Sequence, residues 1–177
     1  MTLDRCNHCT LAGKKCHPQQ GNGKIMFIGE APGEQEINLN KPFTGTSGIF
    51  LRDTLAYLGL DMDNYYVTNT LKCRPSNNKL IWPDAHEQIA ACRNWLRMEL
   101  TTLLPNVIIC VGSVALQGLT NANFYSTYGK LIAYKIGIHT SMVGVIRHPS
   151  YAIRCQWTIE QYAEHIKPYV KAIIQWQ

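Results

Sequence analysis

The sequence predicts an α/β fold of three layers, in which helices cover both faces of a central, mostly parallel four-stranded sheet. Two observations predict this class. Short apolar runs of strand length recur along the chain, and stretches of helical periodicity separate them. Parallel strands need such crossover helices, which pack on the faces of the sheet. The sequence contains no internal repeat and no linker, so we expect a single domain over residues 1–177.

The first half of the chain supplies two expected strands and a helix. Residues 1–23 are polar and rich in cysteine, and they lack periodicity, so we expect an irregular segment that needs something to hold it. Residues 46–60 have a helical apolar face, and Thr46 or Ser47 is suited to cap that helix. The other elements expected here are strands at 24–29 and 65–70 and a loop at 71–82.

The second half continues the alternation. Proline is welcome in the first turn of a helix, so Pro83 opens a long helix that Pro105 ends. We expect strands at 107–112, 130–137 and 141–146, of which the last two are suited to pair with each other. We also expect a short helix at 113–119, a loop at 147–154, and a helix at 159–176 that Pro168 would kink.

The composition is that of a globular protein, with 46% hydrophobic and 16% charged residues. The formal net charge of +5 permits a polyanionic partner without requiring one. The chain starts without the apolar stretch of a secretion signal, and no run of 18 apolar residues occurs. We therefore expect a cytoplasmic protein with no membrane partner.

Folds of this class bind their ligand at the carboxyl ends of the strands. The residue pairs expected at those ends are Gly29-Glu30, Thr68-Asn69, Gly112-Ser113 and Arg147-His148. Three of these four ends carry a side chain that can do chemistry or recognise a ligand. Each side chain also fits a structural role, such as a loop cap for Asn69, a helix N-terminal acid for Glu30 and a turn for His148.

The turn "GEAPGEQE" after the first expected strand does not match a nucleotide-binding loop. No Lys-Ser or Lys-Thr follows it, and Ala31 fills the second glycine position of the dinucleotide fingerprint. Its acids, Glu30, Glu34 and Glu36, would repel phosphate. The turn therefore indicates a site for something other than a nucleotide phosphate.

Seven cysteines without a secretion signal argue against a disulfide framework and favour a metal or a cluster. One possibility is a local zinc site made of Cys6, Cys9, Cys16 and His17. Cys92 lies on the apolar face of the long helix and Cys110 lies in a strand, so both also fit the core.

Several motifs that occur in order resemble those of the family 4 uracil-DNA glycosylases, which carry an iron–sulfur cluster. These motifs are "GEAPGEQE…KPFTGTSGIFL", "YVTNTLKCRP", "VGSVAL" and "HPSYAIR". The resemblance begins at "CNHC" and ends at Arg154, which is most of the chain. It implies the uracil-DNA glycosylase fold and an enzyme of base excision repair that hydrolyses the bond between uracil and its sugar.

The resemblance also implies a role for individual residues. Glu30 would assist attack on the sugar, and Ala31 would shape the pocket wall. Phe43 would stack on uracil, Asn69 would read the edge of the base, and His148 would bond a uracil oxygen. Glu30 and His148 are therefore the expected catalytic residues, and all five are expected to bind uracil.

The same resemblance makes Cys6, Cys9, Cys73 and Cys92 the expected ligands of a [4Fe-4S] cluster, with structural zinc as the alternative. Cationic side chains near the mouth of the site are candidates for contacts to DNA phosphates. They are Lys72, Arg74, Arg147 and Arg154. The expected partner is uracil-containing DNA, and we expect a monomer from a bacterium, an archaeon or a virus-infected cell.

Two functions remain open at this point. One is a uracil-DNA glycosylase that leaves an abasic site. The other is a protein on the same fold, of viral origin for example, that binds nucleic acid or a partner with weak or no cleavage. The joint presence of Glu30, Phe43, Asn69 and His148 favours the enzyme, because a protein that only binds has no need of all four.

Overall fold

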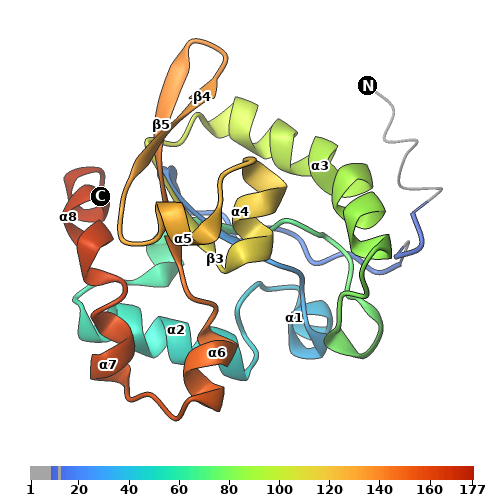
Figure 1. The fold of residues 1–177 in the computed structure, drawn as a ribbon, viewed down its shortest axis with the longest axis horizontal. Helices are drawn as coiled ribbons and strands as arrows, with labels where there is room; N and C mark the ends of the chain where they lie inside the picture. Colours follow the sequence, from blue (N-terminus) through green and yellow to red (C-terminus); the bar gives the residue numbers. More distant parts are fainter. Residues whose placement is uncertain (1–8, 12) are drawn as a thin grey trace.

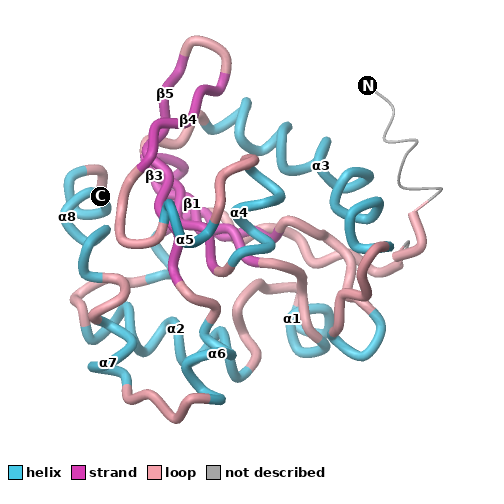
Figure 2. The backbone as a smooth tube through the Cα atoms, viewed as in Figure 1, coloured by secondary structure: helices cyan, strands magenta, loops and turns pink. Residues whose placement is uncertain are grey.

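The computed structural model describes residues 9–11 and 13–177 (Figures 1 and 2). Strands and helices alternate up to the third strand, and two short helices, a hairpin and three further helices follow. The strands are β1 (Asn22–Gly29), β2 (Tyr65–Asn69), β3 (Val107–Val111), β4 (Ile132–Ile136) and β5 (His139–Ile146). The α-helices are α1 (Glu34–Leu39), α2 (Thr46–Tyr57), α3 (Asp84–Leu103), α4 (Ser113–Leu119), α5 (Phe124–Thr127), α6 (Pro149–Arg154), α7 (Ile159–Ala163) and α8 (Lys167–Gln175).

The strands form one sheet in the order β2-β1-β3-β5-β4. The first four of these are parallel, as predicted, and β4 pairs antiparallel with β5. The prediction of four strands is therefore wrong by one. Gly137 and Ile138 alone connect β4 to β5, and Gly137 has a φ of 61°, so this tight turn folds β4 back as an extra edge strand.

Helices cover both faces of the sheet, which confirms the predicted three-layer α/β/α class. On β1, Ile25 and Phe27 face a core formed with α2, α7 and α8, while Met26 and Ile28 face a core formed with α3 and α4. Figure 1 shows α2, α6 and α7 close together on one side of the molecule and α3 and α4 on the other. Both faces of β1 are therefore buried, as is usual for a central parallel strand.

Three local predictions need correction. The residue that caps α2 is Gly45 rather than Thr46 or Ser47, and no side chain caps this helix. The expected loop at 147–154 contains α6, which begins at Pro149 because proline suits the first helical turn. Pro168 likewise lies at the start of α8, so the tail forms two helices instead of one kinked helix.

No helix within residues 9–11 and 13–177 is long and apolar enough to cross a membrane.

Candidate active site

A pocket of about 790 Å³ opens at the carboxyl ends of β1 and β2 and extends to the residues that follow β5. The five residues expected to bind uracil all line it: Glu30, Ala31, Phe43, Asn69 and His148. They come from four separate segments of the chain. The parallel sheet brings the ends of its strands to one edge, and this geometry gathers the side chains there.

Asn69 and Phe43 approach each other over Gly29, at the floor of this pocket. Asn69 ends β2 directly opposite Gly29, and its side chain is almost fully buried. A methyl group added to Gly29 would lie 2.3 Å from Oδ1 of Asn69 and 2.7 Å from Cζ of Phe43. Gly29 is therefore required because any side chain there would displace both the amide and the ring.

The loop that carries Phe43 is held in a strained conformation. Phe43 has a φ of 55°, in the left-handed region that non-glycine residues seldom adopt. Nε of Arg52 donates to the Phe43 carbonyl at 2.9 Å. The Glu36 carboxylate accepts from the backbone N–H groups of Thr44 at 3.1 Å and Gly45 at 2.6 Å. Side chains from two different helices thus hold the loop from both sides.

Sequence reasoning missed the roles of Glu36 and Arg52. In the sequence, Glu36 is one of three acids in a turn that would repel phosphate, and Arg52 is a charged residue within the helix expected at 46–60. Their partners are backbone groups of a loop, so sequence alone does not reveal them. The spacing of Glu36 three residues after Gly33 was the available signal, since its carboxylate also accepts the Gly33 N–H at 3.0 Å.

Glu30 follows β1 and lies largely buried at the edge of the pocket. Burial raises the pKa of Glu30 above its ordinary value, because the ionised carboxylate is poorly solvated there. Its backbone carbonyl accepts from the N–H of Leu71 at 3.0 Å, which fixes the turn against the segment after β2. The carboxyl group thus lines the pocket at a place that is partly withdrawn from water, where its charge would act on a ligand more strongly than in bulk solvent.

His148 both caps α6 and lines the pocket. Its Nδ1 accepts from the backbone N–H of Ser150 at 3.2 Å and lies 2.7 Å from the Ser150 hydroxyl. Because Nδ1 accepts, the proton of the neutral ring belongs on Nε2, which is then a donor. Burial, aided by the nearby Arg154 cation, lowers the pKa of His148 to about 4. The ring is therefore neutral at pH 7.

The structure contradicts one predicted DNA contact, Lys72. Its side chain is only 4% exposed, and the ammonium group donates to Thr68, to the Asn69 carbonyl and to Glu99. All three of its protons are thereby used, so it cannot reach a phosphate. Burial lowers the pKa of Lys72, and the Glu99 carboxylate opposes that shift. A lysine in a polar loop suggested exposure, and its partner on α3 could not be foreseen.

The other three predicted DNA contacts are accessible. Arg74 pairs with the exposed Glu34 at 3.2 Å, and Arg154 lines the pocket with its guanidinium 3.4 Å from the Ser150 hydroxyl. The Arg147 guanidinium lies 4.8 Å from the ring centre of Tyr151 and 5.3 Å from that of Tyr128. Such stacking holds a cation in place without neutralising it.

A second groove of about 790 Å³ lies on the other side of His148. Among residues 9–11 and 13–177, two arginines, aromatic rings and neutral polar side chains line it, and no Asp or Glu does. The arginines are Arg93 and Arg147, and the aromatic residues include Tyr125 and Tyr151. Tyr125 is 81% exposed. His148 lines both the groove and the pocket, so the two spaces meet at this residue.

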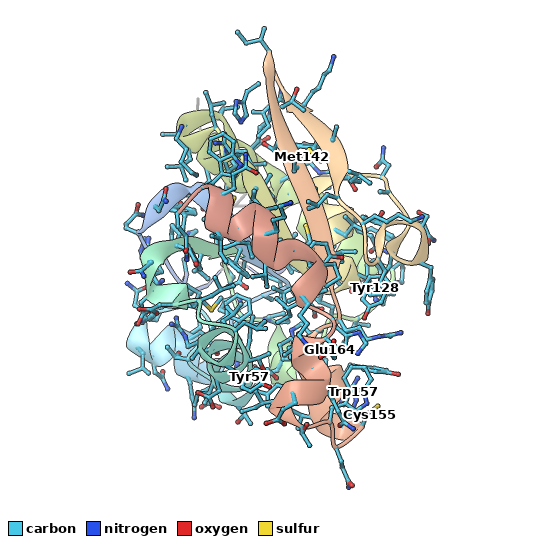
Figure 3. All side chains as sticks on the ribbon, turned by 90° about the vertical axis from the view of Figure 1, so that its left-hand side faces the viewer. Tyr57, Tyr128, Met142, Cys155, Trp157 and Glu164 are labelled. Carbon is cyan, nitrogen blue, oxygen red and sulfur yellow. The ribbon has the colours of Figure 1, made fainter. Side chains whose placement is uncertain are left out.

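The side of the groove at Arg147 is supported by stacked rings. His165 stacks on Trp157 with 4.4 Å between ring centres, and the Tyr128 hydroxyl bonds Nδ1 of His165. Figure 3 shows Tyr128 and Trp157 on the same side of the molecule. This packing fixes Tyr128, which in turn lies against Arg147.

A pocket of about 100 Å³ lies apart from the candidate active site, and three of the four predicted cluster ligands line it. These are Cys9, Cys73 and Cys92, and the remaining walls include Leu11, Leu71 and Trp95. The fourth predicted ligand, Cys6, lies outside the described residues. Among the described residues, no three Cys, His, Asp or Glu side chains are close enough together to hold a single metal ion.

The zinc site expected from Cys6, Cys9, Cys16 and His17 has less structural support than the cluster site. Cys16 and His17 line a different pocket from Cys9, and the Cys16 thiol bonds the His17 carbonyl. Burial raises the pKa of Cys16 to about 11. Cys110 is fully buried within β3 and belongs to the core, as expected.

Fold and site together define an α/β protein with a polar and aromatic pocket at the carboxyl edge of a parallel sheet. Comparison with known proteins gives the family. Residues 18–172 match the model of the Uracil DNA glycosylase superfamily, and the chain belongs to that superfamily.

Curated relatives are similar over much of the chain. A Type-4 uracil-DNA glycosylase of Archaeoglobus fulgidus is 41% identical over 120 residues, which are 66% of this chain and 59% of the relative. One of Sulfurisphaera tokodaii is 32% identical over 151 residues, 82% of this chain and 61% of the relative. The chain thus spans about three fifths of the length of these relatives.

Proposed function

We propose that the protein is a uracil-DNA glycosylase of base excision repair, which takes uracil out of the DNA stack and hydrolyses its bond to the sugar. One observation carries the proposal: Glu30, Phe43, Asn69 and His148 converge on one pocket at the edge of the sheet. The similarity to Type-4 uracil-DNA glycosylases supports it. A base must leave the stack to enter such a pocket.

Recognition of the base falls to Asn69 and Phe43. The amide can accept from N3–H of uracil and donate to O4, and cytosine presents the reverse pattern. Because Asn69 is buried beside Gly29, an unmatched base would leave its amide without partners, which is costly. Phe43 offers a ring for stacking, which typically contributes about 1–3 kcal/mol per base.

The chemistry falls to Glu30 and His148. As the bond from C1′ to N1 breaks, its electron pair goes to uracil and positive charge develops on the sugar. The Glu30 carboxylate stabilises that cation and orients a water molecule, whose oxygen bonds to C1′ while one of its protons passes to the carboxylate. The Nε2–H group of neutral His148 donates to the oxygen of the uracil anion, in the manner of an oxyanion hole.

The DNA strand would pass from the pocket into the groove beyond His148. Arg147 and Arg93 would meet phosphates, and Tyr125 and Tyr151 would stack on bases beside the extracted nucleotide. The described part of the lining carries two arginines and no Asp or Glu, and this balance of charge favours a polyanion. The protein would act as a monomer.

Cys6, Cys9, Cys73 and Cys92 would hold the [4Fe-4S] cluster. A pocket of about 100 Å³ is larger than one ion needs, its walls are largely apolar, and the Lys72 N–H donates to the Cys92 sulfur at 3.3 Å, as suits a thiolate. The cluster would act structurally, by joining the N-terminal segment to the loop after β2 and to α3.

The decisive experiment is incubation of the protein with a labelled oligonucleotide that contains one uracil, followed by alkaline cleavage of abasic sites. We expect a break at uracil and none at thymine or cytosine in matched oligonucleotides. Asn69→Ala and His148→Ala should each slow the reaction while the melting temperature shows a folded protein. If the wild-type protein binds the oligonucleotide and leaves it intact, it is a binding protein and the enzyme proposal is wrong.

A further inference from the structure

The buried ion pair of Lys72 and Glu99 lies between the candidate active site and the cysteine pocket. The Lys72 ammonium lies 2.6 Å from the Thr68 hydroxyl, 2.7 Å from the Asn69 carbonyl and 2.8 Å from each oxygen of Glu99. Burying a charged pair is costly, and an apolar pair would pack there at least as well. Stability alone therefore does not explain this pair.

The pair connects the end of β2 to one face of α3. Asn69 follows Thr68 at the end of β2. One of the three ammonium bonds therefore holds the backbone carbonyl of the residue that would read the base, and a second holds the side chain of the residue before it. The third bond reaches Glu99 on α3. Without it, the Lys72 side chain would lose its bond to that helix.

The same lysine also contacts the cysteine pocket through its backbone. The Lys72 N–H donates to the Cys92 sulfur at 3.3 Å, and the next residue in the chain is Cys73. Cys92 and Glu99 lie seven residues apart on α3, two turns along one face. Helix α3 thus contacts Lys72 twice, once at the backbone and once at the side chain.

We propose that Lys72 and Glu99 are positioning residues for base recognition, and that they tie the Asn69 end of β2 to the helix that carries Cys92. This inference rests on the proposed function for its assignment of Asn69. The pair makes no contact with the base itself. Its effect is to keep the Asn69 amide at the place where uracil N3–H and O4 would meet it.

The test compares wild type with the double variant Lys72→Met/Glu99→Leu. Replacing both partners avoids an unpaired buried charge, so the variant should fold. The measured quantity is the ratio of single-turnover excision rates on uracil and on 3-methyluracil, which cannot donate from N3. We expect this ratio to fall roughly tenfold, the value of one good hydrogen bond. A variant that is merely less folded slows on both bases equally and keeps the ratio, and that outcome would overturn the proposal.

A second readout does not depend on activity. Amide hydrogen exchange should speed up at residues 69–73 in the double variant. Unchanged absorption per chain at roughly 400 nm shows that the variant retains the cluster. The control is Lys167→Met, which breaks an exposed pair with Glu164, labelled in Figure 3. Unchanged exchange at 69–73 would contradict the positioning role even if the wild-type protein proved to be inactive.

Discussion

Replacing Gly29 by alanine should disable base recognition with the addition of one methyl group. The new Cβ would lie 2.3 Å from the Asn69 Oδ1 and 2.7 Å from the Phe43 ring, where ordinary contacts begin at 3.4 Å. Either the amide or the backbone must therefore move by about 1 Å. Overpacking of this kind typically costs about 1–3 kcal/mol of stability. A misplacement of about 1 Å in a reacting constellation can cost about 100-fold in rate.

The assay is single-turnover excision of uracil from a labelled oligonucleotide, with thermal unfolding measured on the same samples. Gly23→Ala is the matched control, because it lies on the same strand and its Cβ would meet only the flexible end of Leu103 at 3.0 Å. We expect Gly29→Ala to lose about 100-fold in rate and the control to stay near wild type. Equal rates for Gly29→Ala and wild type would refute the proposed arrangement of Asn69 and Phe43.

Three further predictions concern the histidine, the buried ion pair and the cysteines. The pKa of His148 is about 4 in the folded protein and about 6.5 in the unfolded chain. The unfolded chain therefore binds the proton first, and stability is lost as the pH falls from 6.5 to 4. Between pH 7 and pH 4.5, urea unfolding should show wild type losing about 2–3 kcal/mol more stability than His148→Gln. Lys72→Met alone leaves the Glu99 carboxylate buried without its counter-ion and should lower the free energy of unfolding in urea by about 3–5 kcal/mol. The double variant Lys72→Met/Glu99→Leu should have a free energy of unfolding much closer to that of wild type. Equal losses in the two variants would argue against a buried pair. Cys73→Ala should abolish absorption near roughly 400 nm, while Cys155→Ala, an exposed cysteine outside the pocket, should retain it; retention in both would exclude Cys73 as a ligand.

Much of this architecture could be predicted from periodicity. The apolar runs that became β1, β2, β3 and β5 are short and clear, and the rule for parallel sheets placed Asn69 and His148 at one edge. The pattern also predicts β4 and its pairing with β5, and the structure confirms both, but the predicted count of four strands does not include this extra edge strand. A two-residue turn folds β4 back onto that edge.

The supporting contacts of the site could not be predicted, for a physical reason. Glu36 and Arg52 act on backbone groups of the Phe43 loop, and those groups come into reach only after the chain has folded. The sequence predicts an exposed Lys72, because a lysine in a polar loop is usually solvated. Its carboxylate partner lies 27 residues further along the chain, on a helix that packs against that loop.

The most direct test of the central claim is the excision rate on uracil and on cytosine, in oligonucleotides of one sequence, for wild type and Asn69→Asp. Asparagine offers a donor to O4 of uracil, and an ionised carboxylate offers only acceptors. We expect wild type to cleave at uracil alone and Asn69→Asp to lose most of that activity. No cleavage by wild type, or equal uracil excision by both proteins, would contradict it.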